Sequence, residues 1–268
     1  MPELPEVETV VRTLESQIKD ACICKVDVRY AKMIEMEPVV FANTLQGEHF
    51  RKFERRGKYL IFRMDHCTLV VHLRMEGKFF IQKPEDVCNK HIHVVFTLHD
   101  ERELRYQDTR KFGRMTLVSK DYDFSHFHNL GPEPFSDACN AMYIYNTCKQ
   151  KAVPLKTLLL DQSFIAGIGN IYADEILFAC SLRPGRRCNR ITHKDAVHLH
   201  DEMVRILKSA IADGGTTIRS YTSSLGVTGR FQLSCMVHTI KKCKVCGSEI
   251  HMKYIGSRSS YYCPECQK

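Results

Sequence analysis

The 268-residue sequence has no apolar run that approaches the roughly 20 residues a membrane-spanning helix needs. It also lacks an export signal, because Met1-Pro2-Glu3-Leu4-Pro5-Glu6 is acidic and broken by two prolines, whereas a signal starts basic and becomes apolar. No internal repeat or low-complexity segment is visible. These absences exclude membrane-spanning and exported classes and predict a soluble protein without a membrane partner.

A disulfide framework is also missing. The count of thirteen cysteines is odd, and nine of them lack the paired spacing found near the C-terminus, namely Cys22, Cys24, Cys67, Cys88, Cys139, Cys148, Cys180, Cys188 and Cys235. Unpaired thiols are typical of a reducing compartment, so we expect the protein in the cytoplasm.

What the sequence does have is ordinary globular composition and an excess of positive charge. Hydrophobic residues make up 44% and charged residues 26%, and the length favours two domains, although one is possible. Thirty-nine Lys and Arg against thirty-one Asp and Glu give a net charge of +8, which favours a polyanionic partner. Charge alone does not establish nucleic-acid binding.

Apolar periodicity predicts an α+β protein. Residues 4–18 repeat at helical spacing after an acidic, proline-containing start. Short alternating runs then predict the strands of a β-sandwich at 25–30, 50–53, 59–64, 69–73, 78–81, 91–98, 103–106 and 114–118. After the break at 130–134, helical patterns follow near 137–150, 154–161, 170–180 and 192–212, and a Gly/Ser/Thr-rich loop follows Gly214.

Two Cys-x-x-Cys pairs close the sequence. Cys243 and Cys246 are separated by sixteen residues from Cys263 and Cys266, a spacing typical of a four-cysteine zinc site on a hairpin. Four thiolates leave no open coordination position, so we expect one structural zinc ion that performs no chemistry. Arg258 lies between the pairs and could reach phosphate, although a solvated surface role is equally compatible with its type.

The N-terminus offers a nucleophile. Removal of Met1, which a small second residue permits, would leave Pro2 as a free secondary amine. Glu3 adjoins this amine and Glu6 lies about one helical turn on, so one carboxylate could move protons while the other positions the terminus. The alternative is that both acids only compensate the dipole at a helix start.

Four motifs in this chain resemble those of formamidopyrimidine-DNA glycosylases, over essentially the whole length. They are Pro2-Glu3-Leu4-Pro5-Glu6-Val7-Glu8-Thr9, His72-Leu73-Arg74-Met75-Glu76-Gly77, Asp108-Thr109-Arg110-Lys111-Phe112-Gly113 and Gly167-Ile168-Gly169-Asn170-Ile171-Tyr172-Ala173, followed by the cysteine finger. The resemblance implies a monomeric base-excision-repair enzyme that removes oxidised purines, namely 8-oxoguanine and formamidopyrimidines, from damaged double-stranded DNA near the nucleoid. It would then cleave the backbone by β,δ-elimination. It implies a catalytic β-sandwich domain (1–130), a helix-two-turns-helix domain (131–233) and a zinc finger (234–268).

The resemblance also implies residue roles. Pro2 would be the Schiff-base nucleophile and Glu3 the acid-base residue, with Glu6 in support and Lys58 as a further member of the catalytic group. Met75, Arg110 and Phe112 would enter the duplex as two apolar wedges and a hydrogen-bonding guanidinium. Without the resemblance, Met75 and Phe112 would be interpreted as core residues.

Phosphate contacts and lesion recognition follow from the same resemblance. Phosphates would be contacted by Lys58, His72, Asn170 and Arg258, although a turn lysine, a strand histidine and a helix-capping asparagine explain Lys58, His72 and Asn170 equally well. Lys156 would be a DNA-binding residue of the helix-two-turns-helix element at 155–180. A loop at 214–231 would close over a flipped 8-oxoguanine, with the carbonyl near Thr216 on N7–H and amides around Arg219 to Tyr221 on O6. Glu76 could line this pocket or be a surface acid.

Two rival functions remain. An endonuclease VIII-like enzyme would share the proline chemistry but prefer oxidised pyrimidines, and it would typically carry glycine where this chain has Leu4. A non-catalytic zinc-finger protein would account for charge and cysteines but not for Pro2 and Glu3. The segment 235–242 lacks the glycine-bearing turn of the family, which leaves the path of the chain into the finger open.

Overall fold

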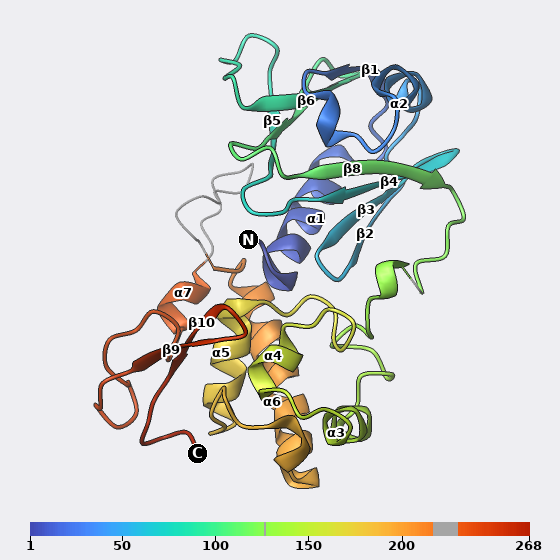
Figure 1. Ribbon diagram of the computed structural model, residues 1–268. Coiled ribbons are helices and arrows are strands. Elements are labelled where there is room, and N and C mark those ends of the chain that lie inside the picture. The colour runs from blue at the N-terminus through green and yellow to red at the C-terminus, as the bar shows by residue number, and fades with distance from the viewer. Residues whose placement is uncertain (126, 217–229) are drawn as a thin grey trace. The chain divides into compact units, whose positions relative to one another are not determined.

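The computed structural model describes residues 1–125, 127–216 and 230–268, which form two compact units (Figure 1). The first unit contains residues 1–125 and the segment that begins at Gly214. The described residues of the second unit are 127–213 and 230–268. The three-domain division expected above stays a prediction, and each unit is described by itself.

Helix α1 (Leu4–Ile18) opens the first unit. Its start is fixed by a reciprocal capping box, in which the N–H of Glu3 donates to Oε2 of Glu6 at 2.8 Å and the Glu3 side chain accepts from the backbone of Glu6. Pro5 occupies the first turn, where its missing N–H costs nothing. The buried stripe ends at Leu14 and Ile18, which packs the helix into the core of the sandwich.

Two four-stranded antiparallel sheets confirm the β-sandwich. One has the strand order β1-β6-β7-β5 and the other β2-β3-β4-β8, and α1 contacts β2 and β3. The strands are β1 (Ile23–Val28), β2 (Lys52–Arg56), β3 (Tyr59–Arg63), β4 (Cys67–His72), β5 (Lys78–Gln82), β6 (Ile92–Leu98), β7 (Glu103–Gln107) and β8 (Arg114–Ser119). All eight predicted strands are present, with no end shifted by more than three residues.

Helix α2 (Pro38–Leu45) was not predicted from the sequence. Its β-branched residues Val39 and Val40 are 63% and 50% exposed, and only Phe41 and Leu45 are buried. Two apolar anchors in eight residues are too few for a helical period to be recognised. A short 3₁₀ turn, η1 (Ala31–Met33), precedes the helix.

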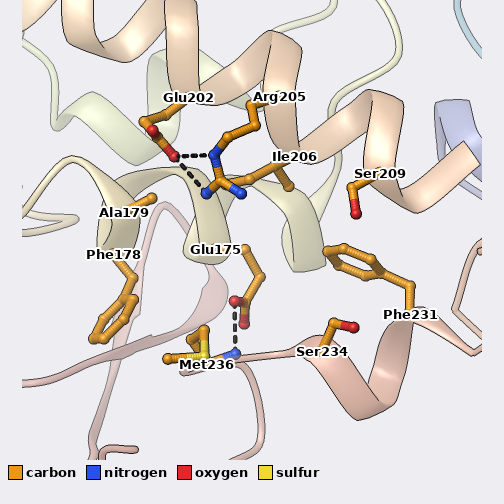
Figure 2. Close-up of a pocket in the computed structure, with 10 residues that line it drawn as sticks. All are labelled: Glu175, Phe178, Ala179, Glu202, Arg205, Ile206, Ser209, Phe231, Ser234 and Met236. Atoms are coloured by element: carbon orange, nitrogen blue, oxygen red, sulfur yellow. Dashed lines mark hydrogen bonds and ion pairs between the residues drawn. The ribbon is translucent and has the colours of Figure 1, made fainter. Parts of the chain in front are cut away.

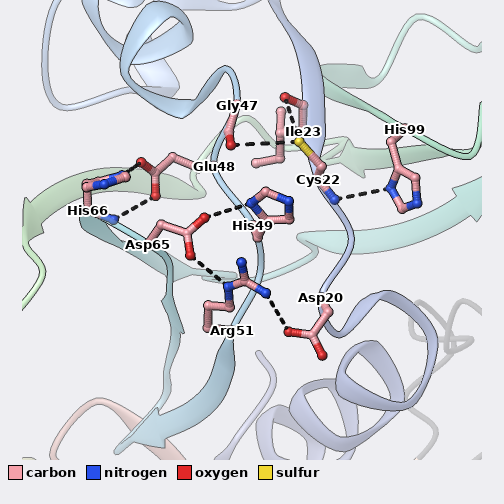
Figure 3. A network of polar contacts seen from close by, with 10 residues as sticks. All are labelled: Asp20, Cys22, Ile23, Gly47, Glu48, His49, Arg51, Asp65, His66 and His99. Carbon is pink, nitrogen blue, oxygen red and sulfur yellow. Dashed lines mark hydrogen bonds and ion pairs between the residues drawn. The ribbon is translucent and has the colours of Figure 1, made fainter.

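A polar network ties the edge of the sandwich together (Figure 3). Asp65 accepts from Nε of Arg51 and contacts Nδ1 of His49, both at 2.7 Å. Arg51 also reaches Oδ1 of Asp20 at 3.0 Å. These charge-assisted hydrogen bonds, the first being that of Arg51, lower the pKa of Asp65 to about 2 from its ordinary value of 3.8.

The lowered pKa of Asp65 predicts a pH-dependent stability difference. Because the folded pKa lies below the unfolded one, the contribution of Asp65 is present above about pH 4 and is lost as the pH falls toward 2. We expect Asp65→Asn to unfold at lower urea than the wild type at pH 6, with the gap closing between pH 4 and 2. Zinc release at low pH affects both proteins equally, so a gap of constant size would contradict the assignment.

The second unit is helical, as predicted. It contains α3 (Ala141–Lys149), α4 (Leu155–Leu159), α5 (Asn170–Ala179), α6 (His193–Ala212) and α7 (Phe231–Ser234), with 3₁₀ turns η2 (Phe127–Asn129) and η3 (Cys188–Arg190). Helix α3 starts later than predicted because the Asn140 side chain accepts from the N–H of Tyr143 and caps the helix there. A Thr192–Asp195 capping box starts α6 where it was expected.

The C-terminal segment forms the expected hairpin of β9 (His251–Ile255) and β10 (Arg258–Tyr262). Its small core contains Val237, Ile250, Cys243 and Cys263, packed with Phe178 of α5. Among the described residues, no helix is long and apolar enough to cross a membrane.

Candidate active site

The carboxylates of Glu3 and Glu6 are both buried, and both accept hydrogen bonds. Glu3 and Glu6 are 3% and 2% exposed. Oε1 of Glu6 accepts from the N–H of Thr216 at 2.7 Å and from its hydroxyl at 3.0 Å, while Oε2 accepts from Glu3. Glu6 therefore links the start of α1 to the segment after Gly214, which mere compensation of a helix dipole would not require.

The α-amine of Met1 lies near the carboxylates of Glu3 and Glu6. Burial lowers the pKa of the Met1 α-amine below its ordinary value of 8.0, while the carboxylates of Glu3, Glu6 and Glu76 raise it and the charge of Lys58 lowers it. Burial and the ammonium of Lys58 thus favour the neutral, nucleophilic form of an amine here. With Met1 attached, the nitrogen of Pro2 belongs to a peptide bond, so its own amine forms only after Met1 is removed.

Lys58 borders this centre from the β2–β3 turn, and His72 is the last residue of β4. Lys58 follows Gly57, whose φ of +56° makes the tight β2–β3 turn, and it is 6% exposed. His72 is buried, accepts from the N–H of Arg74 through Nδ1 at 2.9 Å and packs edge-on against Tyr59. Neither residue is a solvated surface group.

The expected wedge residues line a cavity of about 360 Å³ together with Met1. Phe112 is 46% exposed and Met75 is partly exposed, so neither is a core residue. The guanidinium of Arg110 lies 4.8 Å from the centre of the Phe112 ring. The first unit therefore brings all three predicted insertion residues near the chain end.

Asp108 shapes the loop that carries Phe112, a role that the sequence analysis did not assign. This carboxylate is fully buried and accepts from the N–H groups of Arg110, Phe112 and Gly113 at 3.0, 2.9 and 2.7 Å. Three N–H groups satisfy a buried carboxylate well. A signal was present, because an aspartate before a turn commonly accepts from the N–H two residues on.

Two glycines allow both wedge loops to close on Tyr106. A Cβ atom at Gly77 or Gly113 would overlap the Tyr106 hydroxyl, so each position excludes a side chain. Gly77 ends the loop of Met75, and Gly113 ends the loop of Phe112. The glycine endings of the two motifs are thus explained by packing of one tyrosine of β7.

In the second unit, Asn170 contacts the strand that carries Arg258. Asn170 is the first residue of α5 and contacts Oγ of Ser259, the neighbour of exposed Arg258, at 3.5 Å. Gly169, not Asn170, is the capping residue, and Gly167 turns the chain with a φ of +95°. The N–H groups of a helix start point along its axis and suit a phosphate.

Lys156, which the sequence analysis placed among the DNA-binding residues, is not a surface residue in the structure. Its side chain is fully buried, and its Nζ donates to Oδ1 of Asp174 at 2.6 Å and to the carbonyl of Ser259 at 2.7 Å. A buried ammonium is stable only when it is paired in this way. Lys156 therefore fixes β10 onto α4 and α5 beside Arg258.

The four finger cysteines are arranged for one metal ion. Their sulfur atoms lie within 4.8 Å of one another, with Cys243–Cys266 at 3.8 Å and Cys246–Cys263 at 3.5 Å. A tetrahedral zinc ion with Zn–S bonds of about 2.3 Å requires S–S distances of about 3.8 Å. The donor set fits one structural zinc ion.

The path into the finger, left open by the sequence, is fixed by α5. The two carboxylate oxygens of Glu175 accept hydrogen bonds from the N–H groups of Met236, Val237 and His238 at 2.8 to 3.1 Å. Glu175 and Met236 also line a cavity of about 500 Å³ between α5, α6 and α7 (Figure 2). Thr239, with a φ of +61°, makes the turn without glycine.

The zinc site makes a direct prediction. We expect one zinc ion per chain, and Cys263→Ser should lose the metal and bind duplex DNA weakly, because four thiolates hold a segment with a very small core. Metal analysis and a binding titration measure both effects. Cys24→Ser, which removes an exposed thiol far from the cluster in sequence, should keep metal and affinity; zinc retained in Cys263→Ser would refute the ligand set.

The lesion-pocket predictions are less fully covered by the structure. Thr216 is buried and bonded to Glu6, and Glu76 is half-buried with its charge near the chain end. Arg219 and Tyr221 lie outside the described residues. Their assignments stay predictions.

The fold is shared over the full length with solved protein–DNA complexes. A Lactococcus lactis Fpg bound to DNA containing N7-benzyl-Fapy-dG covers all of both chains with a TM-score of 0.94 and 36% identity. The same organism's Fpg with abasic-site DNA covers 99% of both chains with a TM-score of 0.93 and 35% identity. Fold and finger together define a zinc-finger DNA glycosylase.

Sequence comparisons give the family. Residues 1–115 match the formamidopyrimidine-DNA glycosylase N-terminal domain, residues 130–222 its H2TH domain, and residues 241–268 the zinc finger found in FPG and IleRS. Proteins named formamidopyrimidine-DNA glycosylase are 44% identical in Bacillus licheniformis and 41% identical in Bacillus subtilis, with at least 99% of each chain covered. The chain belongs to the formamidopyrimidine-DNA glycosylase family.

Proposed function

We propose that this protein excises oxidised purines from duplex DNA through a Schiff base on Pro2 and then cleaves the exposed backbone. The observation that carries this proposal is the buried Glu3–Glu6 pair at the chain end, beside a cavity whose wall includes Met75 and Phe112. A non-catalytic DNA-binding protein would not need two buried carboxylates next to an amine.

The chemistry follows from a secondary amine. The nitrogen of Pro2 attacks C1′ of the deoxyribose, the C1′–base bond breaks, and the departing base takes up a proton. Opening of the sugar ring leaves an iminium ion, with Glu3 positioned by the capping box to move protons. The iminium acidifies C2′, so loss of its proton expels the 3′ phosphate, and a second elimination expels the 5′ phosphate.

Duplex binding is assigned to both units. In the first, Phe112 and Met75 replace the stacking of the flipped nucleotide and Arg110 hydrogen-bonds its orphaned partner. His72 and Lys58 would contact phosphate next to the lesion, and Asn170 and Arg258 would do so from the second unit. The charge of Lys58 would in addition disfavour protonation of a Pro2 amine, as it lowers the pKa of the Met1 amine after the larger effect of burial.

Lesion recognition is proposed to start at Thr216. Its N–H and hydroxyl both donate to Glu6, which fixes this residue relative to the catalytic carboxylates. Its carbonyl would accept from N7–H of 8-oxoguanine, which guanine lacks, so a carbonyl facing N7 rejects the normal base. Arg219, Tyr221 and Glu76 would complete this pocket.

One assay tests substrate class and chemistry together. Duplexes carrying 8-oxoguanine or an oxidised pyrimidine are incubated with the protein and borohydride, which reduces an iminium to a stable adduct. We expect an adduct with the purine lesion first and with the pyrimidine lesion more slowly. Faster reaction with the pyrimidine would favour the endonuclease VIII-like alternative, and no adduct with either would reject the proposal.

Cellular location follows as a further part of the proposal. An enzyme that acts on genomic duplex DNA would work at the nucleoid in the cytoplasm.

A further inference from the structure

A second concave surface lies in the helical unit, between the loop that follows α5 and the β9–β10 hairpin. It is a cavity of about 340 Å³. Its walls are formed by Arg183, Pro184, Gly185, Arg186, Lys253, Ile255, Tyr262 and Lys268. No role in the proposed reaction uses this cavity.

Half of the eight lining residues are cationic and none has an acidic side chain. Arg183 donates only to the carbonyls of Gln267 and Pro264, both at 2.9 Å, so its charge is not neutralised by an ion pair among the described residues. Arg186 pairs with Asp195 at 3.1 Å. A cleft lined by one sign of charge concentrates the potential and attracts anions.

Lys253 is held by a ring contact and not by an ion pair among the described residues. Within the described part of the chain it forms no ion pair, and its ammonium lies 5.9 Å from the centre of the Tyr262 ring. It is exposed, as are Arg183 and Lys268, so a polymer can reach all three. The apolar walls, Ile255 and Tyr262, lower the local dielectric and strengthen attraction for an anion.

The register of the hairpin connects this cavity to Arg258. In the β9–β10 ladder, Ile255 pairs with Arg258 and Lys253 pairs with Ser260. Residues opposite each other and residues two apart along a strand share one face, so Lys253 and Arg258 emerge on the same side of the hairpin. Lys253, which lines the cavity, therefore shares a hairpin face with Arg258.

We propose that this cavity binds phosphodiester groups of the DNA arm that flanks the lesion, and so extends the contact begun by Arg258. The inference rests on the proposed function, because it takes the duplex as the ligand. Two ligands could supply phosphate: a DNA backbone that runs past the finger, or a free phosphate compound. The exposed cations and the shared hairpin face favour the DNA backbone. The cavity adds affinity independent of sequence and leaves the chemistry unchanged.

Lys253→Ala tests the inference, with Lys208→Ala as the matched control. Lys208 is also an exposed lysine of this unit, with its ammonium 6.0 Å from the Phe135 ring, but it does not line the cavity. Binding of a duplex carrying a tetrahydrofuran abasic analogue is titrated over a range of salt. We expect Lys253→Ala to lower the slope of log affinity against log salt by about one unit, and Lys253→Arg and Lys208→Ala to retain it.

Shortening the duplex from each end locates the contact. The difference between Lys253→Ala and wild type should vanish once one particular arm is removed. An unchanged slope in Lys253→Ala, or an equal loss in Lys208→Ala, overturns the inference. It is also overturned if inorganic pyrophosphate binds in a Lys253-dependent way while the duplex slope stays unchanged, because the site would then serve a free phosphate compound.

The borohydride adduct separates the two proposals. At saturating duplex, Lys253→Ala should form the adduct at the wild-type rate, because no cavity residue is placed in the catalytic centre. If wild type forms no adduct, the proposed function fails. If wild type forms the adduct but Lys253→Ala and wild type have the same salt slope, only the cavity inference fails.

Discussion

Insertion of one alanine between Met1 and Pro2 should abolish the borohydride-stable adduct and the excision of 8-oxoguanine. After removal of Met1, the inserted residue would carry the free amine and acylate the nitrogen of Pro2. The lone pair of an amide nitrogen is delocalised into the carbonyl, so this nitrogen is no nucleophile. The new amine would be displaced by one residue from the position set by the Glu3–Glu6 capping box.

Peptide mapping of the wild-type adduct measures the same assignment directly. The mass should place the sugar on Pro2 in a chain without Met1. The insertion lies outside α1 and leaves the hydrogen bond from Glu3 to Glu6 in place, so melting curves should match those of the wild type. An adduct on Lys58, or full activity of the insertion variant, would remove Pro2 from the mechanism.

Most of the first unit could be predicted because its patterns are local. Alternating runs fixed all eight strands, and the stripe from Leu4 to Ile18 fixed α1. Helix α2 was not predicted because two of its apolar residues, Val39 and Val40, face solvent. Solvent-facing valines hide the period that a sequence analysis depends on.

The site was predictable in its parts and not in its connections. Motifs identified Glu3, Glu6 and Phe112, but the bond from Thr216 to Glu6 joins residues 210 positions apart, which no local pattern reveals. The burial of Lys156 has the same origin, since its partners Asp174 and Ser259 come from other elements. Long-range pairing decides whether a lysine points to DNA or into the core.

The wedge residues Met75 and Phe112 are exposed and are proposed to act only by insertion, so their truncation should separate insertion from catalysis. Phe112→Ala and Met75→Ala should slow excision of a lesion paired in duplex DNA by about tenfold to a hundredfold. Unstacking a nucleotide costs a few kcal/mol, and each 1.4 kcal/mol that is no longer offset costs about a factor of ten. A pre-formed abasic site has no base to unstack, so its cleavage should change far less.

Lys58→Ala provides the contrast, because a lost phosphate contact weakens binding to lesion and undamaged duplex alike and lowers the salt slope by about one unit. Both wedge side chains are at least partly exposed, so their truncation should leave no cavity in the sandwich and the melting temperature should hold. The Asp108 carboxylate, which holds the loop through three N–H groups, is untouched by Phe112→Ala. Folded variants that lose equal activity on lesion and abasic site, or lose none, would show that Phe112 and Met75 do not act by insertion.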